Sequence, residues 1–176
     1  MITIGNFDGI HLGHQALIQQ AQKIAREKGD LPCYVMTFDP HPRQLFGHND
    51  FMALMSLESK LDILEQMGVN GVYVLHFTRP FSQLSAEDFV NQYLLALHLD
   101  AIVVGSDFTF GYQGLGTVDT LKEAGKGHFS VEAVKLVHDH QFKISSTRIR
   151  GLISAGKINE VSELLGRPYS MNGQST

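Results

Sequence analysis

Two histidines near the start of the chain, His11 and His14, have the residue type and spacing that suit phosphate chemistry. They follow the glycine-containing break from Gly5 to Gly9, which ends a short β-prone run, and they precede a strongly helical segment. A helix start leaves backbone N–H groups unpaired and carries a partial positive charge. Residues three apart lie on the same side of a helical turn. The pattern therefore predicts an anion-binding turn between a strand and a helix, with phosphate oxygens as its natural partner.

A second cluster near the C-terminus, from Ile144 to Arg150, combines hydroxyl and guanidinium groups. Its serines are good N-caps for the helix expected after them. Arg148 falls in the first turn of that helix, where the helix dipole disfavours a cation. An arginine tolerated there indicates that an anion lies nearby.

Between these clusters, strand-like and helix-like segments alternate. After an initial strand at Ile2 to Ile4, strands are expected at 32–38, 72–77, 101–105 and 129–137, and helices at 15–29, 56–68, 85–99, 117–124 and, in two pieces, 144–165. Such alternation predicts an α/β fold: a Rossmann-like, doubly wound parallel sheet of about five strands with helices on both faces. The proline-rich stretch after the second strand, Asp39 to Arg43, is expected to form an extended loop.

The chemically suggestive stretches each follow a strand. They are GNFDG after the first strand, FDPHPR after the second and GSDFTFG after the fourth. In an open parallel sheet, ligands bind beyond the carboxyl ends of the strands, near the point where the strand order reverses. We therefore expect the three stretches to contribute to one site.

The motifs also resemble those of a known family. The chain matches four of that family's motifs: G-x-F-D-G-x-H-x-G-H, I-S-S-T-x-x-R, V-G-x-D-F-x-F-G and F-x-P-H-P. Together they resemble the FMN adenylyltransferase module of the bacterial bifunctional riboflavin kinase/FAD synthetases, within the HxGH nucleotidylyltransferases. The resemblance implies the reaction ATP + FMN → FAD + pyrophosphate, with Mg²⁺ carried mainly by the ATP phosphates and no dedicated metal ligands in the chain.

The same resemblance assigns residues to roles. Those implied in catalysis are His11, His14, Ser146, Thr147 and Arg150. Those implied in binding ATP are Gly5, Asn6, Phe7, Asp8, Gly9, His11, His14, Gly105, Ser145, Ser146, Thr147 and Arg150. Those implied in binding FMN are Phe38, His41, Pro42, Arg43, Asp107, Phe108 and Phe110. Asp8 is read equally well as a residue that orients the site and as a structural cap.

The domain organisation follows from the extent of the resemblance. Residues 1–166 are expected to form the adenylyltransferase domain, and residues 167–176 the start of a linker or tail. In the family this segment leads into a riboflavin kinase domain, which is expected to be missing here.

Composition narrows the class of protein. A net charge of −4 argues against a general nucleic-acid binder, and no apolar run approaches the about 20 residues that span a bilayer. A single cysteine, Cys33, allows no disulfide within the chain, which fits a cytoplasmic protein. Cys33 is interpreted as a buried strand residue, and the stretch His138 to His140 as an exposed turn.

Three interpretations of function remain open from the residues. The first is FMN adenylyltransferase. The second is a nucleotidylyltransferase acting on another phosphorylated acceptor, such as phosphopantetheine, nicotinamide mononucleotide or a glycerol phosphate. The third is a non-catalytic protein that binds flavin nucleotides for regulation. A Walker A interpretation of Gly151 to Lys157 is rejected, because Ile158 stands where a hydroxyl would bind Mg²⁺.

Overall fold

The computed structural model describes residues 1–47 and 51–170. Part of the expected C-terminal tail, residues 171–176, lies outside the described residues. The strands are β1 (Ile2–Ile4), β2 (Tyr34–Asp39), β3 (Gly71–His76), β4 (Ala101–Gly105), β5 (Ser130–Val134), β6 (His138–Asp139) and β7 (Phe142–Lys143). The α-helices are α1 (Leu12–Glu27), α2 (Pro42–Leu45), α3 (Leu57–Gln66), α4 (Arg79–Ser82), α5 (Ala86–Phe89), α6 (Val118–Ala124), α7 (Ser146–Ser154) and α8 (Ile158–Leu165).

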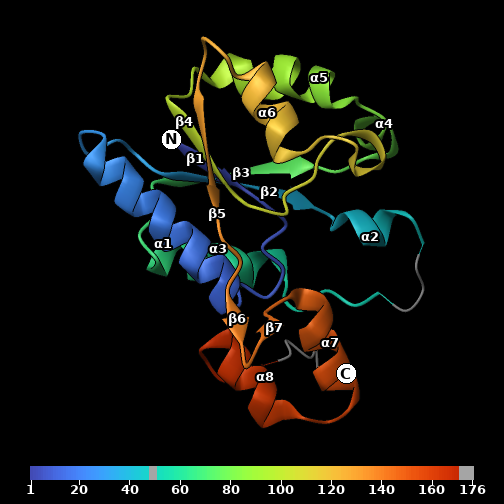
Figure 1. Cartoon of the computed structure of the whole chain (residues 1–176). Helices are drawn as coiled ribbons and strands as arrows, with labels where there is room; N and C mark the ends of the chain where they lie inside the picture. The colour runs from blue at the N-terminus through green and yellow to red at the C-terminus, as the bar shows by residue number, and fades with distance from the viewer. Residues whose placement is uncertain (48–50, 171–176) are drawn as a thin grey trace.

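The expected parallel sheet is confirmed. Five parallel strands lie in the order β3-β2-β1-β4-β5, so the first strand of the chain is the middle of the sheet. Helices α1 and α3 lie on one side of the sheet, and α5 and α6 lie on the other (Figure 1). The strand order reverses at β1, between its neighbours β2 and β4, and the loop that follows β1 therefore opens at the position where such sheets bind ligands.

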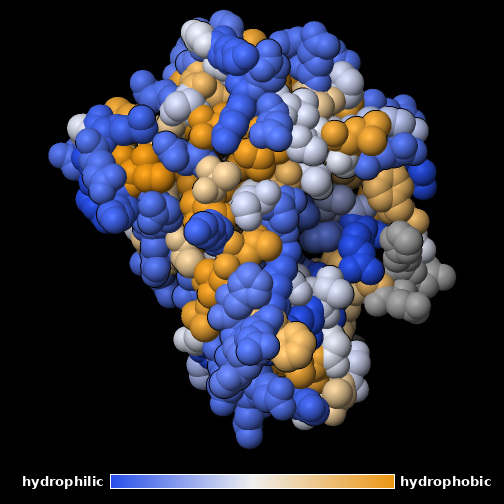
Figure 2. Space-filling model, viewed as in Figure 1, coloured by the Kyte–Doolittle hydropathy of each residue, from blue (hydrophilic) through white to orange (hydrophobic). Residues whose placement is uncertain are grey.

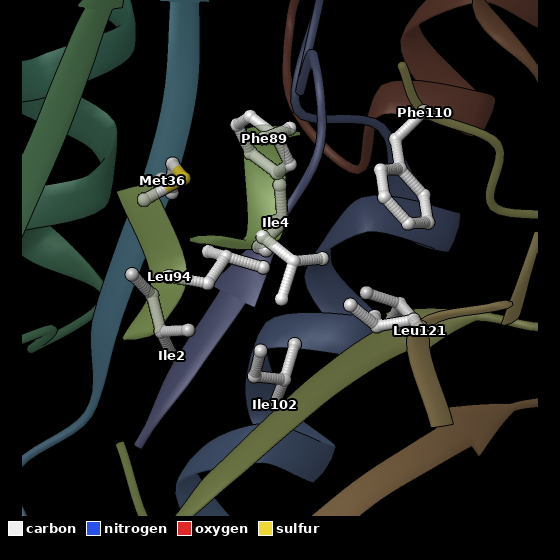
Figure 3. Packing of buried hydrophobic residues seen from close by; sticks show 10 residues of the cluster. Ile2, Ile4, Met36, Phe89, Leu94, Ile102, Phe110 and Leu121 are labelled. Carbon is white, nitrogen blue, oxygen red and sulfur yellow. The ribbon is translucent and has the colours of Figure 1, made fainter. Parts of the chain in front are cut away.

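Alternating strand residues build the two faces of the core. Ile102 and Val104 of β4 face α5 and α6, while Ala101 and Val103 face α1, and all four are fully buried. Figure 3 shows the first of these clusters, in which Ile4 and Ile102 pack with Leu121. Because both faces of β4 are covered, this strand is apolar throughout rather than alternating with polar residues.

The segment expected to form one helix at 85–99 is divided. After α5 the chain widens into a π-helical turn, η1 (Val90–Leu94), and then tightens into a 3₁₀ turn, η2 (Leu95–Leu97). Phe89 and Leu94, five residues apart, are both buried against the sheet, a spacing that suits the wider π turn. Core packing therefore overrides the ordinary helical period in this segment.

The stretch after β2 departs from the expected extended loop at Pro42. Asp39–Pro40 is a cis peptide bond, and Pro42 is the first residue of the short helix α2. Proline is tolerated at the first helical position because the N–H that it lacks would be unpaired there. His41 caps this helix, its ring accepting from the Arg43 N–H at 3.1 Å.

The C-terminal part forms a small cluster of its own beside the sheet. The helices α7 and α8 break at Ala155 and Gly156, as expected, and the β6–β7 hairpin precedes them (Figure 1). The stretch His138 to His140, expected to be an exposed turn, instead supplies strand β6 and enters the hairpin turn at His140. A second short 3₁₀ turn, η3 (Tyr112–Gly114), follows β4. Within the described residues, no helix is both long and apolar enough to cross a membrane.

The packing predicts a stability difference between two aliphatic positions. Ile102→Ala should lower the free energy of unfolding by about 2–5 kcal/mol, because it leaves a cavity between the sheet and α6. Val74→Ala, at a position 38% exposed on edge strand β3, should cost about 1 kcal/mol or less. Urea denaturation of both variants measures the difference, and equal losses would contradict this description of the core.

Candidate active site

The loop after β1 is held in an unusual backbone conformation. Phe7 and Ile10 have positive φ angles of 48° and 40°, although neither residue is glycine. Both side chains are fully buried, so the surrounding core fixes a conformation that costs free energy locally. Gly9 also has a positive φ, and a Cβ there would lie 2.9 Å from Leu54. The loop is therefore a rigid structure rather than a freely moving connection.

The two histidines of the loop form a stacked pair at the start of α1. His11 is the N-cap of this helix, and its Nδ1 accepts from the His14 N–H at 3.3 Å. The rings are 3.7 Å apart between centroids and 15° from parallel, and Phe7 meets His14 edge-on. The helix thus begins at Leu12, three residues before the expected start, because His11 supplies the cap. Both imidazoles lie on one side of the first turn, as the spacing predicts.

Both histidines are neutral at physiological pH. Burial lowers the pKa of His11 to about 4, with a further contribution from the Lys143 ammonium. The pKa of His14 is lowered well below its usual value, first by burial and then by repulsion from His11 and Lys60. Among the described residues, nothing hydrogen-bonds the buried Nδ1 of His14. The pair can therefore offer neutral hydrogen-bonding groups to a phosphate without being ionised first.

A cleft of about 240 Å³ opens beside this pair, and we call it the histidine cleft. Its other walls come from the loop after β4 and from the segment that runs from β5 into α7. Its polar side chains come from His11, His14, Asp107, Lys135, Lys143, Ser145 and Ser146, and Gly5, Gly13 and Gly105 also line it. Figure 2 shows hydrophilic residues gathered around the recess between the sheet and the α7–α8 helices.

The serines in the histidine cleft are held by the start of α7. The Ser145 hydroxyl caps the helix by accepting from the Arg148 N–H at 3.1 Å. The Ser146 hydroxyl donates to the backbone oxygen of Asp8 at 2.8 Å, joining α7 to the loop after β1. The anion expected near Arg148 is a side chain of the protein itself, because the Arg148 guanidinium pairs with the Asp139 carboxylate at 3.0 Å.

A larger, aromatic pocket of about 760 Å³ adjoins the histidine cleft. Its lining includes Asn6, Phe38, Pro42, Phe46, Phe77, Arg79, Phe81, Phe89, Phe108, Phe110 and Tyr112. The rings of Phe38, Phe77 and Phe81 contact one another at centroid distances of 5.3–6.0 Å. Gly5 and Phe108 line both cavities, so the two meet at the carboxyl ends of β1 and β4.

The structure separates some residues that the sequence grouped together. Asp107, assigned to FMN, lies in the histidine cleft and pairs with Lys143. His41 and Arg43, also assigned to FMN, line neither cavity. Instead His41 stacks on the ring of Phe51 at 4.5 Å, and the Arg43 guanidinium lies 5.0 Å from that ring. Thr147, in the first turn of α7, is not part of either lining.

Arg150 lies behind the loop after β1 and lines neither of these two cavities. Its guanidinium pairs with the Asp8 carboxylate, donates through Nε to the Met52 backbone oxygen at 2.9 Å and lies over the Phe51 ring. Asp8 also accepts from the Leu54 N–H at 2.9 Å. Burial raises the pKa of the Asp8 carboxyl, and the Arg150 charge opposes that rise. Asp8 therefore ties the loop to two distant parts of the chain.

Sequence reasoning missed several residues of the two cavities. Lys143 directly precedes the Ile144 to Arg150 cluster, and its place beside that cluster was an available signal. No sequence motif marked Phe77, Arg79 and Phe81 as site residues. They line the aromatic pocket only because α4 packs on the sheet.

A family model and the curated relatives indicate the same family. The model of the family described as FAD synthetase matches residues 1–148. A bifunctional riboflavin kinase/FMN adenylyltransferase of Listeria monocytogenes is 42% identical over 98% of this chain, and the match covers 55% of that protein. A protein of the same description from Escherichia coli strain K12 is 35% identical, with 99% and 56% covered. The chain thus spans about half the length of these curated relatives.

Two solved structures with a similar fold differ in how similar their sequences are to this chain. A structure described as a macrolide-efflux protein from Streptococcus pneumoniae is 38% identical with a TM-score of 0.84, covering 96% of this chain and 65% of that one. The pantothenate synthetase of Thermus thermophilus has a TM-score of 0.53 at 16% identity, covering 94% and 73%. The second likeness shows a shared fold alone.

The low pKa of His11 predicts how stability depends on pH. The unfolded state takes up a proton near pH 6.5, whereas folded His11 does so only near pH 4, so stability falls as pH drops between these values. His11→Asn keeps a capping side chain but removes this titration. Between pH 7.5 and 4.5 the wild type should lose about 2 kcal/mol more stability than the variant.

Denaturant titrations at several pH values measure this difference. Asp8, whose raised pKa acts in the opposite sense, is present in both proteins and does not affect the comparison. Parallel pH dependence in the two proteins would show that His11 keeps an ordinary pKa.

Proposed function

Because the chain belongs to the FAD synthetase family, we propose that it transfers the adenylyl group of ATP to the phosphate of FMN, giving FAD and pyrophosphate. The observation that carries the proposal is the pairing of two unlike cavities. The histidine cleft offers neutral donors and a lysine, and the aromatic pocket offers rings with the size and flatness to pack on a flavin. The cavities meet at Gly5 and Phe108, where the two phosphates must react.

The reaction requires alignment more than acid–base chemistry. An oxygen of the FMN phosphate attacks the α-phosphorus of ATP, a new P–O bond forms, and the bond from the α-phosphorus to the bridging oxygen breaks, so that pyrophosphate leaves with the electron pair. The attacking phosphate is already anionic near pH 7, and no strong base is needed. The protein must bring two polyanions together and stabilise charge as it develops on the leaving group.

In this proposal the histidine cleft binds the triphosphate. His11 and His14 donate hydrogen bonds to it as neutral imidazoles, with His14 at the α-phosphate. The hydroxyls of Ser145, Ser146 and Thr147 stand at the start of α7, where the helix dipole favours an anion. Lys143 adds a positive charge on the same wall.

Arg150 requires a change of partner to act in this site. By family resemblance it binds the leaving pyrophosphate, yet here its guanidinium pairs with Asp8. The side chain is long enough to exchange one anion for another, and a polyphosphate competes well for a planar guanidinium. We propose that this exchange accompanies ATP binding.

The aromatic pocket then holds the flavin ring. Phe38, Phe108 and Phe110 line it, as the resemblance implies, together with Arg79, whose charge suits an acceptor that carries a phosphate. Pro42 shapes the same wall. His41 and Arg43 would reach the FMN phosphate from the α2 side of the pocket, in company with Phe51.

ATP is proposed to enter as its magnesium complex. In the described residues, no group of three His, Cys, Asp or Glu side chains is placed to hold a metal ion, and the cleft carboxylate Asp107 is paired with Lys143. Mg²⁺ commonly keeps its waters and substrate phosphates as ligands. The ion would neutralise part of the phosphate charge.

We also propose that the protein acts in the cytoplasm. A cytoplasmic location supplies ATP and suits the buried free thiol of Cys33. The names of the relatives join adenylyl transfer to riboflavin kinase activity, and the second activity is a property of those proteins.

The choice of acceptor tests the proposed function. With ATP and Mg²⁺, the 176-residue chain should convert FMN to FAD and release pyrophosphate in equal amount. Riboflavin should give no adenylylated product, because it lacks the phosphate oxygen that attacks. Chromatography of the flavins and a pyrophosphate assay measure both products, with nicotinamide mononucleotide, phosphopantetheine and glycerol phosphate as comparison acceptors. Faster turnover of another acceptor than of FMN would show that this other acceptor is the substrate. Binding of FMN without turnover of any acceptor would favour the regulatory interpretation.

Replacing Arg150 tests its assigned role. Arg150→Ala should weaken ATP binding about 10- to 100-fold, the usual worth of a charge-assisted hydrogen bond, and leave FMN binding within about threefold. Arg150→Lys should recover only part of the loss, because an ammonium lacks the planar fork. Arg26→Ala, on the exposed face of α1, is the matched control. Calorimetric titration with each substrate separately distinguishes the two sites, and an equal loss for ATP and FMN would indicate general destabilisation instead.

A further inference from the structure

A buried lysine lies behind the loop that separates the two cavities. Lys60, on α3, is only 7% exposed, and its Nζ donates to the backbone oxygen of Asn6 at 2.8 Å. The fully buried Thr37 on β2 donates to the same oxygen at 3.0 Å, and its Oγ1 lies 3.4 Å from the Lys60 Nζ. Two side chains from different elements therefore hold one carbonyl of the loop.

Burying this ammonium is costly to the fold. Removal from water disfavours the charged form, and burial accordingly lowers the pKa of Lys60. The carboxylates of Asp8 and Asp39 attract the charge, but neither is bonded directly to it. An apolar side chain of similar length would fill this space at lower cost, as replacements of buried charges in other proteins show. The position therefore calls for an explanation beyond packing.

The geometry of the held peptide supplies that explanation. Asn6–Phe7 is a trans peptide, so its N–H points away from its C=O. With the carbonyl turned towards Lys60 and Thr37, the Phe7 N–H is turned away from them, and no described residue accepts from it. Phe7 lines the histidine cleft and Asn6 lines the aromatic pocket. The lysine thus fixes the direction of a backbone donor at the junction of the cavities.

We propose that Lys60 is a positioning residue for adenylyl transfer, which holds the Asn6–Phe7 peptide at the junction where the two substrate phosphates meet. This inference rests on the proposed function. Lys60 does not touch either substrate, and it acts through the loop and through a fixed positive charge behind it. Loss of the ammonium should disturb the alignment of the bound substrates more than the binding of each one, because each substrate has most of its contacts elsewhere in its own cavity.

Kinetic constants of matched variants test this role. Lys60→Met, which keeps the length of the side chain, should lower kcat about 10- to 100-fold and leave KM for ATP and FMN within about threefold. Thr37→Val should lower kcat in the same way but less, while Thr37→Ser, which keeps the hydroxyl, should stay close to the wild type. Lys23→Met, at an exposed lysine of α1, is the control for loss of a charge. The double variant Lys60→Met/Thr37→Val should lose less than the product of the single effects, since both groups hold one oxygen.

A second measurement follows the peptide without turnover. The Phe7 amide nitrogen is bonded to the Asn6 carbonyl carbon, so its ¹⁵N resonance in the free protein should shift in Lys60→Met and Thr37→Val but not in Thr37→Ser or Lys23→Met. Wild-type protein that makes no FAD would refute the proposed function. The Phe7 resonance would still test whether Lys60 and Thr37 hold the Asn6–Phe7 peptide. Active wild type with an unchanged kcat in folded Lys60→Met would overturn the inference. If Lys60→Met does not fold, an unchanged kcat and an unchanged Phe7 resonance in Thr37→Val would overturn it.

Discussion

The loop after β1 depends on polar contacts from distant parts of the chain, and the arrangement of both cavities depends on that loop. Its backbone turns through positive φ angles that Phe7 and Ile10 would not adopt alone. The side chains and carbonyls of the loop are held by Lys60 and Thr37 at Asn6, by Arg150, Leu54 and Ser146 at Asp8, and by Arg167 at Gly9. These contacts join the sheet, α3 and α7 into one frame around the site.

The frame explains why the two cavities differ in character. On one side, the start of α1 and the start of α7 face each other, so the histidine cleft is walled by helix N-termini, hydroxyls and neutral imidazoles. On the other, β2, α4 and the loop after β4 bring phenylalanine rings together. A nucleotide triphosphate suits the first surroundings and a flat aromatic ring suits the second. The chemistry proposed for the chain follows from placing these surroundings side by side.

The sequence predicted those parts of the molecule that local pattern controls. The parallel sheet, strand β4 and the break at Ala155 and Gly156 are all where hydrophobic pattern and glycine placed them. The π turn at Val90–Leu94 was not predictable, because it reflects packing of Phe89 and Leu94 on a sheet assembled from other parts of the chain.

The same limit applies to the site. Lys60 lies in an amphipathic helix, where lysine usually indicates a solvent-exposed face, and only the tertiary fold buries it under Asn6. Asp107 was assigned to FMN binding by resemblance to the V-G-x-D-F-x-F-G motif, and in the structure it lines the histidine cleft. Motif matching therefore located loops that line the two cavities but could not divide their residues between them, and the binding roles stay predictions.

A crystal structure of the protein with α,β-methylene-ATP and FMN bound together would show directly whether the two cavities hold the two substrates. We expect the triphosphate beside His11 and His14 and the flavin ring among the rings of the aromatic pocket. The FMN phosphate should meet the α-phosphorus next to Gly5. Both ligands competing for one cavity, or phosphates lying in separate cavities too far apart to react, would contradict this arrangement.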